Sequence, residues 1–248
     1  MSFPNTISGI YGWEKQTTSD QRNKLGTEMH FVDGRKYRYV ENGAVAIEEG
    51  MVVASEAPAA NHDDDRPVAT TAAGSTTIAV TLGATVAAKN LYAEGYVFFN
   101  LPTLSTAGTR AFYKIKSHEY VASAGVLTAN LEEPDGLVKA VTNGTETAGL
   151  IKNPYKDIVV APGAVLGRFI GLAPCQIAAS YFGWVQVAGM AVAAIDGTPA
   201  IGTLVGASST HAGSLLTVAG DTTPALARIH GIAGVNDEYH TVMLMNLY

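Results

Sequence analysis

The stretch Phe182-Gly-Trp-Val-Gln-Val-Ala-Gly189 decides the fold, because it opens a run of short apolar segments separated by glycines. Asp196-Gly197 within this run is a tight-turn signal. The spacing predicts a compact all-β module with Trp184 in its core. The further strands expected in it are residues 191–195, 202–205, 214–218, 227–232 and 241–247.

Turn signals of the same kind extend upstream. Asp33-Gly34 joins two strand-like segments, 28–32 and 35–40, and is the strongest hairpin signal in the chain. Residues 84–92 form the one plausible short helix outside the N-terminal region. Short strands punctuated by Gly, Pro, Asn and Asp are typical of β-sandwich or barrel modules and not of βαβ units. The predicted fold class is therefore all-β, with sandwich or barrel modules.

Four segments are expected along the chain: an extended N-terminal arm (1–25), a β-hairpin segment with an acidic loop (26–66), a β module (67–157) and a C-terminal β module (158–248). The arm is polar and aperiodic over 14–24, so it cannot offset its ordering entropy alone. Tyr11 and Trp13 carry large apolar area with few rotatable bonds. We expect the arm to dock on a partner; the alternative is that both aromatic side chains pack on their own domain.

Composition narrows the classes of partner. Charged residues make up 15% of the 248 residues and apolar residues 47%, against a typical charged share of about 25%. This indicates either a surface covered by partners or a β-rich surface of Thr, Ser, Gly and Ala. The net charge is −6 and the basic residues form no stripe beyond Arg35-Lys36 and Arg38, which disfavours nucleic acid. No secretion signal or bilayer-spanning apolar run is visible, so synthesis in a cytoplasm and no membrane partner are expected.

Signatures of catalysis or metal binding are absent from the sequence. It has no G-x-S-x-G elbow, no phosphate-binding loop and no histidine pair at zinc spacing. The acidic stretch Asn61-His62-Asp63-Asp64-Asp65 lacks the spacing of a calcium loop and is expected to be solvated. Cys175 lies in an apolar setting and is expected to be a buried, unreactive thiol. The sequence therefore predicts a protein that is not an enzyme, with no catalytic residue, cofactor or metal.

The order of these pieces resembles the decoration, or cement, proteins that stabilise the heads of tailed phages. The stretches that carry the resemblance are Tyr181-Phe-Gly-Trp-Val-Gln186, Ile195-Asp-Gly-Thr-Pro-Ala-Ile-Gly202, Ile229-His-Gly-Ile-Ala233, Tyr239-His-Thr-Val-Met-Leu244, the hairpin over 25–39, and Phe112-Tyr-Lys-Ile-Lys-Ser-His118.

The resemblance implies a virion structural protein, made in the host cytoplasm, that binds the outer surface of a phage capsid and bridges neighbouring capsid subunits. Its partners would be the major capsid protein and further copies of itself, as a homotrimer at three-fold positions or, alternatively, a dimer at two-fold positions. The expected interface residues are Ile10, Tyr11, Trp13, Arg35 and Arg38. The alternative function is a surface-displayed binding module that recognises a glycan or host surface through exposed aromatic side chains and loop Asp or Asn.

Overall fold

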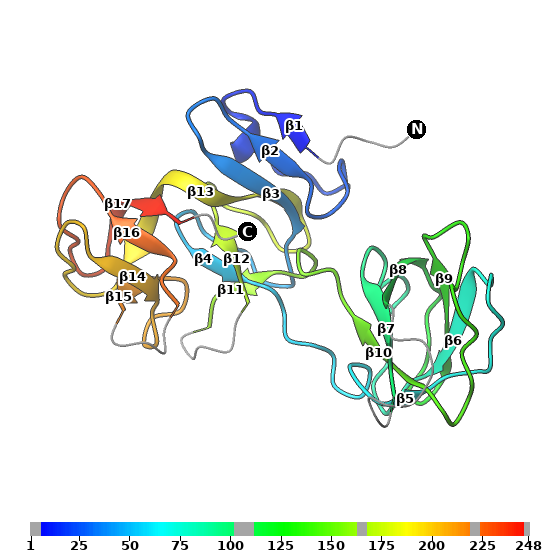
Figure 1. Ribbon diagram of the computed structural model, residues 1–248. Coiled ribbons are helices and arrows are strands. Elements are labelled where there is room, and N and C mark those ends of the chain that lie inside the picture. Colours follow the sequence, from blue (N-terminus) through cyan, green and yellow to red (C-terminus); the bar gives the residue numbers. More distant parts are fainter. Residues whose placement is uncertain (1–5, 102–111, 163–167, 219–223, 246–248) are drawn as a thin grey trace. The chain divides into compact units, whose positions relative to one another are not determined.

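A computed structural model describes residues 6–101, 112–162, 168–218 and 224–245. It confirms the all-β prediction: the described residues form strands and turns, and their one helical element is the 3-10 turn η1 (Trp13–Lys15). The chain divides into two compact units. Residues Ala57–Asn153 form an inserted unit, and Met1–Glu56 together with Pro154–Tyr248 form the main unit (Figure 1).

The inserted unit is a closed antiparallel barrel. Its sheet runs in the order β5-β10-β7-β8-β9-β6. A bridge between Val68 and Val80, with the Ala69 N–H donating to the Ala79 carbonyl at 3.0 Å, joins the end of β5 back to β6. The strands are β5 (Arg66–Pro67), β6 (Thr77–Thr81), β7 (Tyr96–Asn100), β8 (Phe112–Ser117), β9 (Val126–Leu131) and β10 (Thr147–Ile151).

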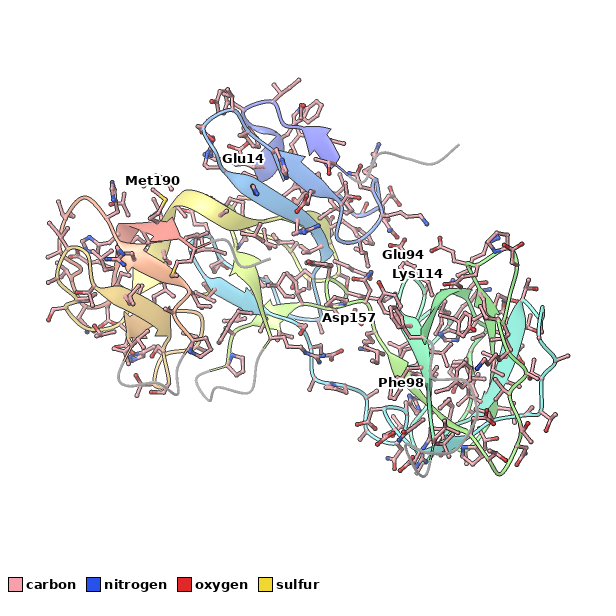
Figure 2. The ribbon with its side chains drawn as sticks, viewed as in Figure 1. Glu14, Glu94, Phe98, Lys114, Asp157 and Met190 are labelled. Atoms are coloured by element: carbon pink, nitrogen blue, oxygen red, sulfur yellow. The ribbon has the colours of Figure 1, made fainter. Side chains whose placement is uncertain are left out.

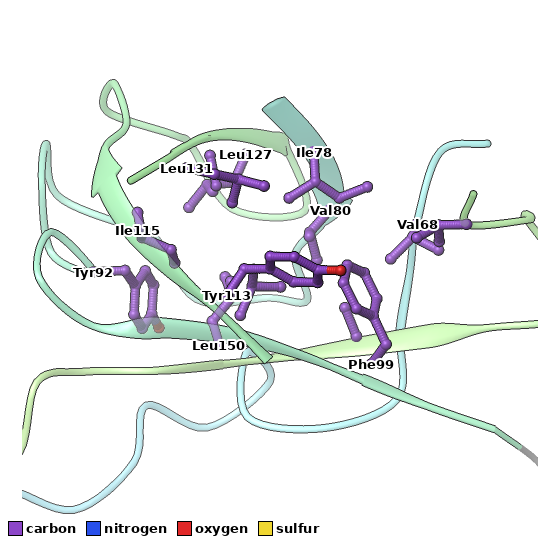
Figure 3. Packing of buried hydrophobic residues seen from close by; sticks show 14 of the residues in the cluster. Val68, Ile78, Val80, Tyr92, Phe99, Tyr113, Ile115, Leu127, Leu131 and Leu150 are labelled. Carbon is purple, nitrogen blue, oxygen red and sulfur yellow. The ribbon is translucent and has the colours of Figure 1, made fainter. Parts of the chain in front are cut away.

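The barrel interior is filled by every second residue of these strands, as the two-residue period of a strand requires. In β9, Leu127, Ala129 and Leu131 are buried while the residues between them are exposed. The rings of Phe99 and Tyr113 lie with centroids 6.0 Å apart within this core (Figure 3).

Three polar aromatic side chains are buried at one end of the barrel, where the helix over 84–92 was predicted. That prediction is wrong: Ala87 exchanges backbone hydrogen bonds with Val121, and Asn90 has a left-handed φ of 59°, which an α-helix does not accommodate. The Tyr92 hydroxyl lies 2.6 Å from His62 Nδ1, and the Tyr92 N–H donates to His118 Nε2 at 3.0 Å. The prediction of a solvated loop over 61–65 is therefore wrong at His62, which is fully buried. Asp63 to Asp65 are exposed, as expected.

The main unit begins with a second closed ring of strands. β3 (Lys36–Glu41), β13 (Phe182–Ile195), β12 (Phe169–Leu172), β4 (Val52–Ala54) and β11 (Val159–Val160) pair antiparallel in that order. The Gly43 N–H donates to the Ile158 carbonyl at 2.9 Å, and the Ile158 N–H donates to the Glu41 carbonyl at 3.0 Å, so the end of β3 meets the start of β11. Val40, Val53, Ile158, Ile170 and Val185 are among the side chains that fill this ring.

The C-terminal half of β13 belongs to a third ring. It pairs with β17 (Glu238–Leu244) and, at Ile195, with β15 (Leu215–Thr217), and β14 (Leu204–Ala207) and β16 (Ala227–Ile229) complete the circuit. A bulge between Gln186 and Ala188, followed by Gly189 at a φ of 89°, lies where β13 passes from one ring to the next. Two of the predicted segments, 182–189 and 191–195, are thus one strand; the predicted end of the last strand reaches past Met245, outside the described residues.

The predicted arm is part of the main unit from Thr6 onward. β1 (Thr6–Ser8) pairs in parallel with β2 (Glu28–His30), and Ile7 packs on the aromatic cluster that contains the buried Trp184. Backbone pairing with β2 orders this segment even though its sequence has no core periodicity. The predicted segments 1–25 and 158–248 and residues 26–56 consequently share one unit, because β3 and β12 both pair with β13, whereas the acidic loop of the predicted segment 26–66 belongs to the inserted unit.

We predict that Tyr92→Phe destabilises the inserted unit selectively. His62 Nε2 lies 2.9 Å from the Thr85 carbonyl and must donate to it, so Nδ1 accepts the Tyr92 hydroxyl proton. Loss of that buried donor should lower the free energy of unfolding of the inserted unit by about 1–2 kcal/mol. Both tryptophans, Trp13 and Trp184, lie in the main unit. In urea unfolding, the transition seen by circular dichroism should therefore shift while that seen by tryptophan fluorescence stays in place; the exposed-site control Tyr120→Phe should shift neither.

Candidate functional site

Two of the predicted interface residues lie together beside the tip of the β2–β3 hairpin. Ile10 and Tyr11 are each 60% exposed, and Val32 in the hairpin turn is 95% exposed. The Tyr11 ring lies 5.3 Å from the Phe31 ring, and the Gly9 N–H donates to the His30 carbonyl at 2.8 Å. We refer to Ile10, Tyr11 and Val32 as the hairpin-tip patch.

Arg35 fixes the aromatic side of this patch. Its guanidinium carbon lies 5.5 Å from the Tyr11 ring centroid and 4.9 Å from that of Phe31, which is cation–π distance. Nε donates to Asp33 Oδ2 at 2.8 Å, and Nη1 donates to the Tyr37 hydroxyl at 2.9 Å. The cation is therefore held from two sides while it supports the exposed ring of Tyr11.

The side chains of the other two predicted residues have surroundings of their own, although the Trp13 N–H donates to the Ile10 carbonyl at 3.0 Å. Trp13 is 38% exposed on η1 and lines a small hollow of about 190 Å³ together with Tyr39 and Trp184. Arg38 is engaged within the sheet: Nη2 lies 2.6 Å from Glu28 Oε1, and Nη1 donates to the Gly26 carbonyl at 2.8 Å. The structure thus gathers Ile10, Tyr11 and Arg35, and gives Arg38 a different set of partners.

A hollow of the main unit lies beside the bulge of β13, and we call it the bend cavity. Its volume is about 570 Å³. Six separate parts of the chain line it: Glu14 and Lys15 of η1, Arg35 and Tyr37 at the start of β3, Glu49 and Gly50 before β4, Leu172 to Pro174 at the end of β12, Gln186 and Met190 to Val192 of β13, and Tyr239 and Thr241 of β17. Figure 2 labels Glu14 and Met190, two of these side chains, on η1 and β13. No sequence motif marks this site, because its residues converge only when the rings have closed.

A polar network forms one wall of the bend cavity. Glu14 is only 5% exposed; its Oε2 accepts the Gly12 N–H at 2.7 Å, and its Oε1 lies 3.6 Å from Arg35 Nη1. Burial raises the pKa of Tyr37 to about 12, so this phenol stays protonated at neutral pH. Gln186 donates from Nε2 to the carbonyls of Ala188 at 3.0 Å and Met190 at 2.7 Å, and so braces the bulge.

A serine, a histidine and an aspartate meet at a second place, in the C-terminal ring. His211 Nδ1 lies 3.1 Å from Asp196 Oδ2, and the Ser208 hydroxyl donates to the same oxygen. Ser208 Oγ also accepts the N–H groups of Thr210 and His211, both at 3.0 Å. A hydrolytic triad needs the serine hydroxyl on the far nitrogen of the imidazole. Here the hydroxyl and the imidazole share one carboxylate, so the arrangement braces a turn.

Metal and thiol chemistry have little support in the described ranges. No group of three or more His, Cys, Asp or Glu side chains there could hold a metal ion. Cys175 is half-buried, and burial raises the pKa of its thiol, which favours the unreactive protonated form. No helix among the described residues is long and apolar enough to cross a membrane.

We predict that His211 titrates above its ordinary value. Hydrogen bonds from Ser208 and Thr210 lower the pKa of Asp196, and the Asp196 carboxylate raises the pKa of His211 above 6.5. The Asp196 contribution to stability is lost as pH falls through its lowered pKa, and the His211 contribution is lost as pH rises through its raised pKa. Both are fully present between about pH 4 and 6.5.

Titration of the His211 ring protons by NMR checks this. Asp196→Asn should return the midpoint toward the ordinary value, whereas Asp237→Asn, whose charge makes the smallest contribution to the raised pKa, should lower it less. Equal midpoints in the wild type and Asp196→Asn would contradict the ion pair.

Comparisons with known protein families, with curated proteins and with solved structures found no match for this chain.

Proposed function

We propose that this chain is a structural protein of a phage virion that binds the outer surface of the capsid and bridges neighbouring capsid subunits. The observation that carries the proposal is the hairpin-tip patch. Large apolar side chains that stay exposed on adjoining segments of a structure are typical of protein-binding surfaces. Its partners would be the major capsid protein and further copies of the chain.

The contacts that hold Tyr11 in place suit this role. Tyr11 packs on Phe31 with the two rings tilted by 35°, and the Arg35 guanidinium lies 5.5 Å from its ring centroid, so these contacts restrict the ring before a partner arrives. Ordering a side chain at an interface otherwise costs about 0.5–1.5 kcal/mol. A modest binding free energy at each copy is enough, because the binding free energies of many copies on one lattice add together. The low charged share of 15% is compatible with further surface covered by subunits.

We predict that Val32→Asp and Tyr11→Ala each weaken attachment to capsids. Truncation of a central aromatic contact typically costs about 2 kcal/mol, roughly a thirtyfold loss of affinity. The assay is co-sedimentation of purified protein with capsids from a phage strain that lacks this gene. Val138→Asp is the matched control, since Val138 is a valine in a bend of the inserted unit with 79% exposure. Capsids that leave the wild-type chain in the supernatant would overturn the proposed function, and wild-type affinity of both patch variants would overturn the assigned surface.

We also predict that the working form is a homotrimer. Light scattering coupled to size exclusion should give about three times the chain mass of 25.9 kDa, or the trimer should be seen on the particle itself by electron microscopy. Twice that mass would favour the dimer at two-fold positions. Single, separate copies on the capsid together with a monomer in solution would contradict a closed oligomer.

A further inference from the structure

We propose that the bend cavity binds a neutral saccharide unit. This goes beyond capsid attachment and does not depend on it, because no residue of the hairpin-tip patch lines the cavity; Arg35, which does line it, also contacts Tyr11 of the patch. A volume of about 570 Å³ falls within the range of small-molecule sites, about 300–1,000 Å³.

The polar wall has hydrogen-bonding capacity to spare. A carboxylate offers about four acceptor positions and a guanidinium five N–H donors. Glu14 accepts one hydrogen bond, from Gly12, and its 3.6 Å separation from Arg35 is too long for another. Arg35 donates from Nε and Nη1, and its Nη2 has no partner in the described ranges of the chain. A nearby acceptor and donor with free positions match vicinal hydroxyl groups, each of which both donates and accepts.

The charge of the cavity favours a neutral ligand. Its charged lining residues are Glu14 and Glu49 against Lys15 and Arg35, two of each sign. Asp33, which lies outside the lining, adds a further carboxylate at 2.8 Å from Arg35. An anionic sugar would meet these carboxylates, and a cationic ligand would meet the two cations. A polyhydroxylated ring without charge uses both kinds of group without a net electrostatic cost.

Tyr239 supplies an apolar platform. Its ring is 52% exposed, and it packs so closely on Gly50 that a Cβ at that position would lie 2.5 Å from Tyr239 Cε1. Gly50 also has a φ of 75°, so glycine is favoured there on both grounds. Gly50 therefore lets the ring lie close against the backbone, and the exposed part of the ring offers an aromatic surface with a polar tip, against which the C–H face of a sugar can pack. Met190 and Val192 extend this apolar side of the cavity.

The test is a titration of the full-length chain, followed by ¹H–¹⁵N NMR, with glucose, galactose, mannose, N-acetylglucosamine, lactose and maltose. At least one should give saturable shifts at residues that line the bend cavity. Glu49→Gln, an exposed substitution that should not disturb folding, and Tyr239→Ala should each weaken binding at least threefold. Tyr239→Phe should retain it. Tyr120→Ala in the inserted unit is the matched control and should leave it unchanged.

Three results would overturn the proposal: no saturable shift with any of these sugars at about 50 mM, well above a millimolar dissociation constant; shifts confined to residues outside the cavity; or stronger binding of glucuronic acid or of a peptide than of every neutral sugar. Capsid co-sedimentation of Glu49→Gln separates the two proposals, because this variant should still attach to capsids.

Discussion

The main unit depends on a single strand that belongs to two closed rings. β13 gives its first half to β3 and β12 and its second half to β17 and β15. A strand in two rings must turn without losing its backbone partners, and the bulge at Gln186–Ala188 with Gly189 achieves this. Gln186 then binds the carbonyls that the bulge frees, at Ala188 and Met190. The bend cavity exists because the strand bends here.

Local signals predicted the turns and strands well. Asp33-Gly34 and Asp196-Gly197 were recognised from residue type alone, and both glycines have positive φ values, 86° and 88°. The helix expected over 84–92 failed because alanines are good helix formers in isolation, whereas Ala87 is bound to Val121 on a distant loop. Tertiary pairing overrode local propensity, and no local pattern contains that information.

The candidate site was predictable only where it is carried by a short segment. Ile10 and Tyr11 were recognisable as aromatic and aliphatic side chains in a polar region, and both are exposed. The pairing of Arg35 with Glu14 could not be anticipated, because it requires η1 to pack beside β13. Tyr239 is likewise unremarkable in sequence; its role follows from the glycine at position 50 in another part of the chain.

The insertion of one closed barrel between the two halves of another unit has a consequence for synthesis. All strands of the inserted unit lie within Ala57–Asn153, so they can find one another as soon as this stretch has left the ribosome. Lys36–Glu41 can pair at once with Glu28–His30, but its other edge must wait for Phe182–Ile195, and Val52–Ala54 must wait for Val159–Val160 and Phe169–Leu172. Pairings between such distant residues form slowly, because the entropy cost of closing a long loop comes before any contact stabilises the pair. Until Phe182–Ile195 has been made, these strands have unpaired edges, and the nascent chain is therefore most prone to aggregate during this period.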